Sequence, residues 1–237
     1  MTSTLADNSV RPAAPTDAPL GGRADSVMPW GMAEYYRLLF DRLRQAWPEK
    51  VPQHPVVGFT SCRRSEGVST VCRFLTITAA HKLEQPVLLL DAVRDEGFGT
   101  TESSQTAGLF DVLAGQAEPA DVVQHYLARW AYHIAAGSSE ARAHTEFRRE
   151  VFTRLIDLLK REFAFTVVDL PPCQAPSECL AMAGVLDGVV LVVEAERVRA
   201  PIVCRARDQL FQSGALLLGV VLNKRRNHVP EWLYRLL

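Results

Sequence analysis

Short apolar runs alternate along the chain with longer stretches whose apolar positions recur at helical spacing. The β-branched and aliphatic runs predict strands over residues 56–60, 87–90, 132–136, 165–169, 188–193 and 216–223. The stretches between them predict helices over 69–83, 141–163, 177–185 and 200–213, with a short helix near 108–113. Because parallel neighbours need crossover connections, this alternation predicts an α/β fold of three layers, with a doubly wound, mostly parallel sheet.

The N-terminal part of the chain has a different pattern. Residues 1–27 are rich in Ala, Pro, Thr, Asp and Gly without apolar periodicity, so we expect a disordered N-terminal tail there. Residues 32–47 place Tyr36, Phe40 and Leu43 at helical spacing among charged residues, which predicts an amphipathic helix before the core. A length of 237 residues suits one α/β domain, so we expect a single domain over 28–237.

Composition narrows the classes of function. With 22% charged residues and a formal net charge of -1, the chain lacks the basic excess that favours nucleic acid, so we expect no nucleic-acid partner. The best apolar run, 183–193, is interrupted by Asp187 and is too short to cross a bilayer. We therefore expect a cytoplasmic protein. The five cysteines and six histidines show no spacing typical of a metal site.

A loop typical of phosphate binding follows the first predicted strand. Its sequence is Ser61-Cys62-Arg63-Arg64-Ser65-Glu66-Gly67-Val68-Ser69-Thr70, and a predicted helix comes next. A strand, a loop of small residues with a glycine and two hydroxyls, and a helix form the context of a P-loop, in which backbone N–H groups hold phosphate. The lysine of that motif would fall at Val68 and its first glycine at Ser61, so the match by itself is weak.

Polar residues end three further predicted strands. Asp91, Asp169 and Asn223 each stand at or just after the end of such a strand. In doubly wound sheets ligands bind at the carboxyl ends of the strands, so we expect these side chains to gather around the same crevice as the loop.

Several segments together resemble a known family, the cytoplasmic bacterial tyrosine kinases of capsule and exopolysaccharide systems. The resemblance covers nearly everything after residue 30 and rests on Glu34-Tyr35-Tyr36-Arg37, the loop ending at Thr70, Leu88-Leu89-Leu90-Asp91-Ala92, residues 108–115, Val168-Asp169-Leu170-Pro171-Pro172 and Gly219-Val220-Val221-Leu222-Asn223. These kinases are related to the MinD and ParA ATPases. The resemblance implies a fold of the P-loop NTPase type and a partner that is an inner-membrane polysaccharide chain-length or export protein.

The resemblance also implies roles for individual residues. Ser69 would ligand Mg²⁺, Thr70 would contact the α-phosphate, and Asn223 would lie near the adenine. Asp169 would be the Walker B carboxylate and a second metal ligand, and Asp91, which opens the family's second aspartate motif, would be catalytic with it. The segment Ser65, Glu66, Gly67, Val68, Ser69 and Thr70 would bind ATP or ADP.

The departures from the family pattern concentrate in the catalytic segments. Val68 stands in place of the phosphate-binding lysine, and Val93 in place of the second aspartate after Asp91. Valine offers no donor, so the loop loses a charge-assisted hydrogen bond of about 1.5 to 3 kcal/mol in the ground state. A transition-state loss of about 3 to 4 kcal/mol would lower the rate roughly 10² to 10³-fold. We therefore expect an impaired kinase that binds ATP or ADP with Mg²⁺ weakly.

Alternatives remain open at this point. Arg63 and Arg64 could replace the missing charge, although we favour solvated loop charges, and we interpret Lys224-Arg225-Arg226 as a solvated turn. Phe40 stands where the family's oligomerisation helix has an arginine, which leaves a homo-oligomer in doubt. Three functions compete: a degenerate kinase that regulates or scaffolds polysaccharide synthesis and export, an active autokinase with an unorthodox loop, and a MinD-like positioning ATPase.

Overall fold

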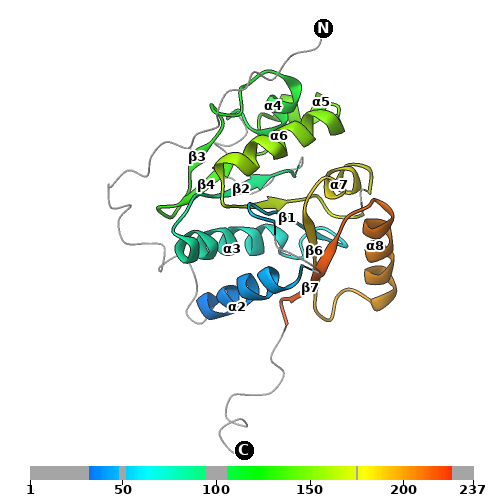
Figure 1. The fold of residues 1–237 in the computed structure, drawn as a ribbon. Helices are drawn as coiled ribbons and strands as arrows, with labels where there is room; N and C mark the ends of the chain where they lie inside the picture. Colours follow the sequence, from blue (N-terminus) through cyan, green and yellow to red (C-terminus); the bar gives the residue numbers. More distant parts are fainter. Residues whose placement is uncertain (1–31, 48–51, 94–105, 175, 226–237) are drawn as a thin grey trace, which may run out of the picture.

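A seven-stranded sheet runs through the centre of the structure, a computed structural model that describes residues 32–47, 52–93, 106–174 and 176–225 (Figure 1). The strand order is β3-β4-β2-β5-β1-β6-β7, and every neighbouring pair is parallel except β3 and β4. The strands are β1 (Val56–Ser61), β2 (Val87–Asp91), β3 (Gln124–His125), β4 (Ala131–Ile134), β5 (Phe165–Asp169), β6 (Gly188–Glu194) and β7 (Leu217–Asn223).

Helices cover both faces of this sheet. α2 (Met32–Gln45) and α3 (Val68–Leu83) lie on one face. The opposite face carries α4 (Leu109–Ala114), α5 (Ser139–His144), α6 (Arg149–Glu162), α7 (Pro176–Ala183) and α8 (Ala200–Gln212). The prediction of a three-layer, doubly wound α/β fold with a mostly parallel sheet is confirmed.

The strand residues alternate between two apolar cores. On β1, Val56 packs into the core beneath α4 to α8, whereas Val57 and Phe59 pack into the core beneath α2 and α3. Because both faces of a parallel sheet are buried, each central strand is a continuous apolar run in the sequence, and this is why the strands could be predicted.

The predicted helix over 32–47 is present as α2, which lies outside α3. The ring of Tyr36 packs 5.4 Å from that of Phe74 on α3, and the ring of Phe40 meets Phe165 edge-on at 5.5 Å. Tyr35 is half exposed, while Tyr36 is buried, so the two neighbouring tyrosines face different surroundings. The tail expected over 1–27 lies outside the described residues.

The prediction of a single helix over 141–163 is wrong. The segment forms α5, which starts earlier because the Ser138 hydroxyl accepts a hydrogen bond from the Ala141 N–H at 3.1 Å, and a separate helix α6. The chain between them is extended at Thr145 and Arg148. This break lets the ring of Phe147 pack 5.5 Å from that of Phe152, which a continuous helix would not allow.

The strand predicted over 132–136 is also shifted, because β4 ends at Ile134. Beyond that point the carbonyl groups of Ala135 and Ala136 accept hydrogen bonds from the N–H groups of Leu109 and Phe110 at the start of α4, at 2.8 and 2.9 Å. The chain therefore leaves the sheet after Ile134, and its carbonyl groups pair with the first N–H groups of α4 instead.

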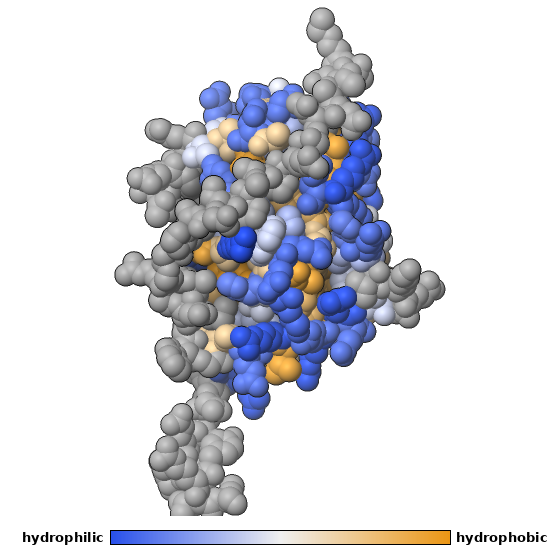
Figure 2. All heavy atoms as spheres, turned by 60° about the vertical axis from the view of Figure 1, so that its left-hand side comes forward, coloured by the Kyte–Doolittle hydropathy of each residue, from blue (hydrophilic) through white to orange (hydrophobic). Residues whose placement is uncertain are grey.

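The surface is mainly polar on the side where α2, α3 and β3 come forward. Figure 2 shows hydrophilic residues over much of the described surface on this side, with apolar residues visible between them in several separate areas. Within the described ranges, every helix is too short or too polar to cross a membrane.

Candidate nucleotide site

The loop between β1 and α3 borders a cavity of about 580 Å³ at the carboxyl ends of the strands. The ends of β5 and β7 and the segment after β2 complete its walls. The lining residues are Ser61, Arg64, Ser65, Glu66, Gly67, Val68, Ser69, Thr70, Val93, Asp169, Leu170, Pro172 and Lys224. The loop residues and Asp169, expected from the sequence to share one crevice, thus surround a common space. Asp91 and Asn223, expected at the same crevice, are not among its lining residues.

The backbone of the loop turns sharply to start α3. Ser65 has a φ of 66° and Gly67 a φ of 91°, both in the left-handed region. Gly67 is the residue before α3, and no side chain caps this end of the helix. The first N–H groups of a helix have no partner within it and attract anions, so the start of α3 beside this cavity suits a phosphate group.

Gly67 also has no room for a side chain. A Cβ atom at this position would lie 2.3 Å from the Nδ2 atom of Asn223. Asn223 itself donates a hydrogen bond from Nδ2 to the Glu66 carbonyl at 2.9 Å. Among the described residues, the side chain of Asn223 therefore supports the loop from the end of β7, whereas its expected place near an adenine stays a prediction.

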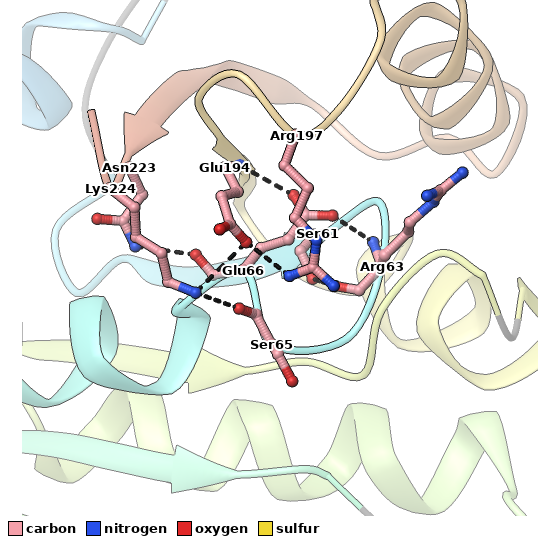
Figure 3. Close-up of polar contacts among 8 residues, drawn as sticks. All are labelled: Ser61, Arg63, Ser65, Glu66, Glu194, Arg197, Asn223 and Lys224. Carbon is pink, nitrogen blue, oxygen red and sulfur yellow. Dashed lines mark hydrogen bonds and ion pairs between the residues drawn. The ribbon is translucent and has the colours of Figure 1, made fainter. Parts of the chain in front are cut away.

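Glu66 holds the loop from inside. Its carboxylate is buried and accepts hydrogen bonds from the backbone N–H of Arg63 at 2.7 Å and from that of Glu194 at 3.2 Å (Figure 3). Burial raises the pKa of Glu66, while these two N–H groups lower it. The sequence predicts Glu66 as a nucleotide-binding residue, and Glu66 lines the cavity, but its carboxylate is occupied by hydrogen bonds from the loop backbone and from β6.

Two aspartates end the neighbouring strands β2 and β5. Asp169 lines the cavity, and burial raises its pKa to about 8, with the charge of Asp91 adding to the rise and a hydrogen bond from Ser69 opposing it. Burial likewise raises the pKa of Asp91 to about 6, against the Val93 N–H and the charge of Arg142. Both carboxyl groups thus hold protons more tightly than exposed aspartates do.

The surroundings of Asp169 fit a magnesium ion. Its Oδ1 atom is buried and, within the part of the chain that the structure describes, has no hydrogen-bond partner. The Ser69 hydroxyl lies within hydrogen-bond reach of the same carboxylate. Mg²⁺ prefers oxygen ligands and is often held by one or two protein groups together with substrate phosphates, so Ser69 and Asp169 suit this ion.

The positive charges around the cavity differ from those that the sequence suggested. Val68 brings an apolar side chain to the wall, and Arg64 also lines it. Arg63 lines a separate cavity of about 510 Å³ beside α8 instead. Lys224 is exposed, in agreement with its interpretation as part of a solvated turn, but it also lines the main cavity, which the sequence did not predict. Lys224 directly follows Asn223, a predicted site residue, in the sequence. Its place at the cavity can be inferred from this only when the strand order is known.

Sequence comparison identifies the relatives of the chain. The tyrosine-protein kinase CpsD of Streptococcus agalactiae is 27% identical over 182 residues, which cover 76% of this chain and 80% of CpsD. This chain is a homologue of the CpsD and CapB tyrosine kinases. The succinoglycan biosynthesis transport protein ExoP of Rhizobium meliloti is 30% identical over 179 residues, which cover 71% of this chain and only 22% of ExoP. No family model matches the chain.

Solved structures of related proteins show the same fold. The kinase domain of the Escherichia coli tyrosine kinase ETK superimposes with a TM-score of 0.73 at 24% identity, covering 84% of this chain and 78% of that domain. MinD of Pyrococcus horikoshii, solved in complex with Mg-ADP, superimposes with a TM-score of 0.59 at 19% identity, covering 78% and 77%. The expected resemblance to bacterial tyrosine kinases and to MinD and ParA ATPases is confirmed.

Proposed function

We propose that the chain is a catalytically impaired tyrosine kinase-like subunit that regulates or scaffolds exopolysaccharide or capsule synthesis and export. The observation that carries this proposal is the wall of the cavity, where Ser69 and Asp169 are retained but Val68 occupies the lysine position of the motif. The homology to CpsD and ExoP supports a place in polysaccharide synthesis.

The impairment follows from what the two valines cannot do. Val68 has no donor to stabilise charge that develops on a transferred phosphoryl group, and such electrostatic stabilisation is usually a large part of catalysis. Val93 lies at the cavity where the family pattern has its second aspartate. One carboxylate, Asp91, then remains of that motif, and it lies next to Asp169 on the neighbouring strand.

We propose that ATP or ADP binds weakly in the cavity together with Mg²⁺. The backbone of residues 65–70 would hold the phosphates, with Thr70 at the α-phosphate, and Ser69 and Asp169 would hold the ion. When bound, the ion neutralises charge on the phosphate oxygens. The residues of this chain position the phosphates through Gly67 and the start of α3, and Asn223 keeps the loop in place.

The partner we propose is an inner-membrane polysaccharide chain-length or export protein, which would recruit this cytoplasmic chain to the membrane. ExoP, a transport protein by name, carries the matching segment within a much longer chain, which supports such an association. A nucleotide that binds two conformations unequally would change which surface is presented to this partner, even without turnover. Assembly into a homo-oligomer is compatible with this role and is also a proposal.

Gene deletion in the native host, with surface polysaccharide as the readout, tests the proposal. We expect less polymer after deletion, and recovery when the wild-type gene or the Ser69→Ala or Asp169→Asn variant is supplied. Normal polymer after deletion contradicts the proposed role. Recovery with the wild-type gene alone would mean that an occupied nucleotide site is needed after all.

A second candidate, an active autokinase, is favoured by the two cations that line the cavity, Arg64 and Lys224. Incubation of the purified protein with labelled ATP and detection of phosphotyrosine separates the two candidates. We expect little or no incorporation. Stoichiometric labelling that disappears in Asp169→Asn would establish the autokinase.

A further inference from the structure

A lysine at the end of β7 lies over the phosphate loop. Lys224 donates a hydrogen bond from Nζ to the Ser65 carbonyl at 2.5 Å, and its Nζ lies 3.3 Å from Oε2 of Glu194 (Figure 3). Its side chain lines the same cavity as Ser69 and Asp169. The side chain is 44% exposed, yet these two contacts hold its ammonium group beside the loop.

Two features of the strand end direct this side chain. Asn223, the preceding residue, is fixed by its hydrogen bond to the Glu66 carbonyl, and Lys224 itself has a φ of 54° in the left-handed region. The Cε atom of Lys224 lies 3.6 Å from the place where a Cβ of Gly67 would be. The lysine stem therefore crosses the loop directly before Val68, the position from which the motif's own lysine would reach the phosphates.

We propose that Lys224 is the phosphate-binding cation of this site and supplies from β7, for nucleotide binding in the ground state, the charge that Val68 cannot supply. Its ligand would be the di- or triphosphate of a nucleotide bound with Mg²⁺. The proposal rests on the proposed function only in taking this cavity as the nucleotide site. An ammonium group is a compact point charge that binds phosphate without demanding one geometry, so it can act from a new direction.

The charges around Lys224 allow this exchange. Arg197 donates a hydrogen bond from Nη1 to the same Oε2 atom of Glu194 at 2.8 Å. If Lys224 turns from Glu194 to a phosphate, the glutamate keeps its arginine partner and its charge stays compensated. Movement of the ammonium group toward the cavity thus leaves the partly exposed Glu194 carboxylate paired with Arg197.

Of the two loop arginines, Arg64 is the competitor to Lys224. Arg63 lines the other cavity, and its side chain points away from Lys224 in Figure 3. Arg64 lines the main cavity from the loop itself and is exposed, as Lys224 also is. Lys224 is attached to a sheet strand through the fixed Asn223, so it reaches the loop from a rigid element.

Titration of ATP and of ADP with Mg²⁺ onto the full-length protein tests the inference. We expect Lys224→Met to weaken nucleotide binding about 10-fold or more, equivalent to about 1.4 kcal/mol. The control Arg225→Ala removes the next, exposed cation of the chain and should change the affinity less than about 2-fold, as screened surface charges do. Thermal melting of each variant checks that it is folded.

A rescue variant makes the test specific. In the double variant Lys224→Met with Val68→Lys, the cation returns to the motif's own position, and we expect most of the lost affinity to return. If Lys224→Met binds nucleotide as the wild type does, the inference is overturned, and a loss in Arg64→Met instead would assign the role to Arg64. A wild-type protein that binds no nucleotide also overturns it, whereas the proposed scaffold role is then still decided separately by the polysaccharide measurement.

Discussion

Asp91 and Asp169 lie directly opposite each other at the carboxyl ends of two neighbouring parallel strands. Both are buried, and the negative charge of Asp91 adds to the rise in the pKa of Asp169. Like charges this close favour states in which the pair keeps a proton. When both carboxyl groups are ionised, their repulsion therefore destabilises the folded protein, and a bound cation would relieve it. In the free protein this repulsion depends on pH.

We predict that the free protein loses stability as the pH rises from 6.5 to 8. The pKa of Asp169 is raised to about 8, so between the ordinary aspartate value of about 4 and pH 8 the folded state holds a proton that the unfolded state has lost. The stabilisation is complete below about pH 4 and disappears as the pH rises through 8. Denaturant unfolding in EDTA, repeated across this pH range, measures the slope.

The range above pH 6.5 isolates this effect from that of His133. Burial lowers the pKa of His133 to about 4, so stability from this histidine is lost as the pH falls from about 6.5 to 4. We expect Asp169→Asn to flatten the slope between pH 6.5 and 8, and Asp157→Asn, at an exposed position of α6, to leave it as in the wild type. An equal slope in wild type and Asp169→Asn would show that Asp169 ionises normally.

Alanine substitution at two glycines separates backbone strain from steric conflict. Gly67 and Gly214 both have positive φ values, 91° and 82°, but a Cβ would meet the Asn223 amide at Gly67 and nothing within 4 Å at Gly214. We expect Gly214→Ala to cost about 1 kcal/mol, from the left-handed backbone alone. Gly67→Ala should cost about 1 to 3 kcal/mol more, through overpacking, and should also weaken nucleotide binding.

Urea unfolding of both glycine variants gives the two free energies of unfolding. Equal losses at Gly67 and Gly214 would mean that Asn223 moves aside without cost and that the loop is not fixed from β7. A larger loss at Gly67 without any change in nucleotide affinity would contradict the assignment of this loop as the phosphate site.

A third prediction concerns the segment over 108–115. The buried carboxylate of Asp111 accepts hydrogen bonds from the Gly108 N–H at 2.9 Å and from the N–H and hydroxyl of Ser138 at 2.9 and 2.8 Å. Asp111→Ala would leave these donors without a partner, and we expect it to cost about 3 kcal/mol of unfolding free energy. Asp121→Ala, at an exposed site, should stay within about 0.5 kcal/mol of the wild type, as measured by urea unfolding. A small effect of Asp111→Ala would mean that water replaces these contacts.

The sequence was most informative where one local cause sets the structure. The strand over 165–169 was predicted to the residue, because a buried parallel strand is a continuous apolar run, and the loop was found because its glycine and hydroxyls are neighbours in the chain. β3, by contrast, consists of two exposed polar residues, Gln124 and His125, that form a strand only by pairing with β4. An edge strand of this kind has no pattern of apolar residues from which it could be predicted.

The parts of the site that were missed depend on contacts between distant segments. Lys224 reaches Ser65 across 159 positions of the chain, and Glu66 meets the Glu194 backbone across 128. These contacts exist because β7 lies beside β6, which lies beside β1, an order that the pattern of apolar residues does not contain. The polar residue at the end of each strand could be predicted from the sequence. The residues that it contacts from other segments could not.

The last prediction concerns Val68 itself. Val68 opens α3 at the cavity wall, so a lysine there would extend toward the phosphates from a loop that still has Gly67, Ser69 and Thr70. A new ammonium group should strengthen ATP binding by about 1 to 3 kcal/mol, or about 5- to 150-fold in Kd. If Lys224 supplies a charge in the wild type, the gain in affinity from Val68→Lys should lie near the lower end of this range in the wild-type background. The gain should be larger in the Lys224→Met background.

Isothermal titration with ATP and Mg²⁺ measures both gains, and Val68→Met serves as the control, since it adds length at the same position without charge. Val68 is largely buried, so both variants should lose some stability from displaced packing, and melting curves show whether this loss is the same for the two. Equal gains from Val68→Lys in the two backgrounds would show that Lys224 and residue 68 act on different groups. Unchanged affinity in both, in folded proteins, would mean that position 68 does not face a phosphate and that the loop binds nucleotide differently from the P-loop it resembles.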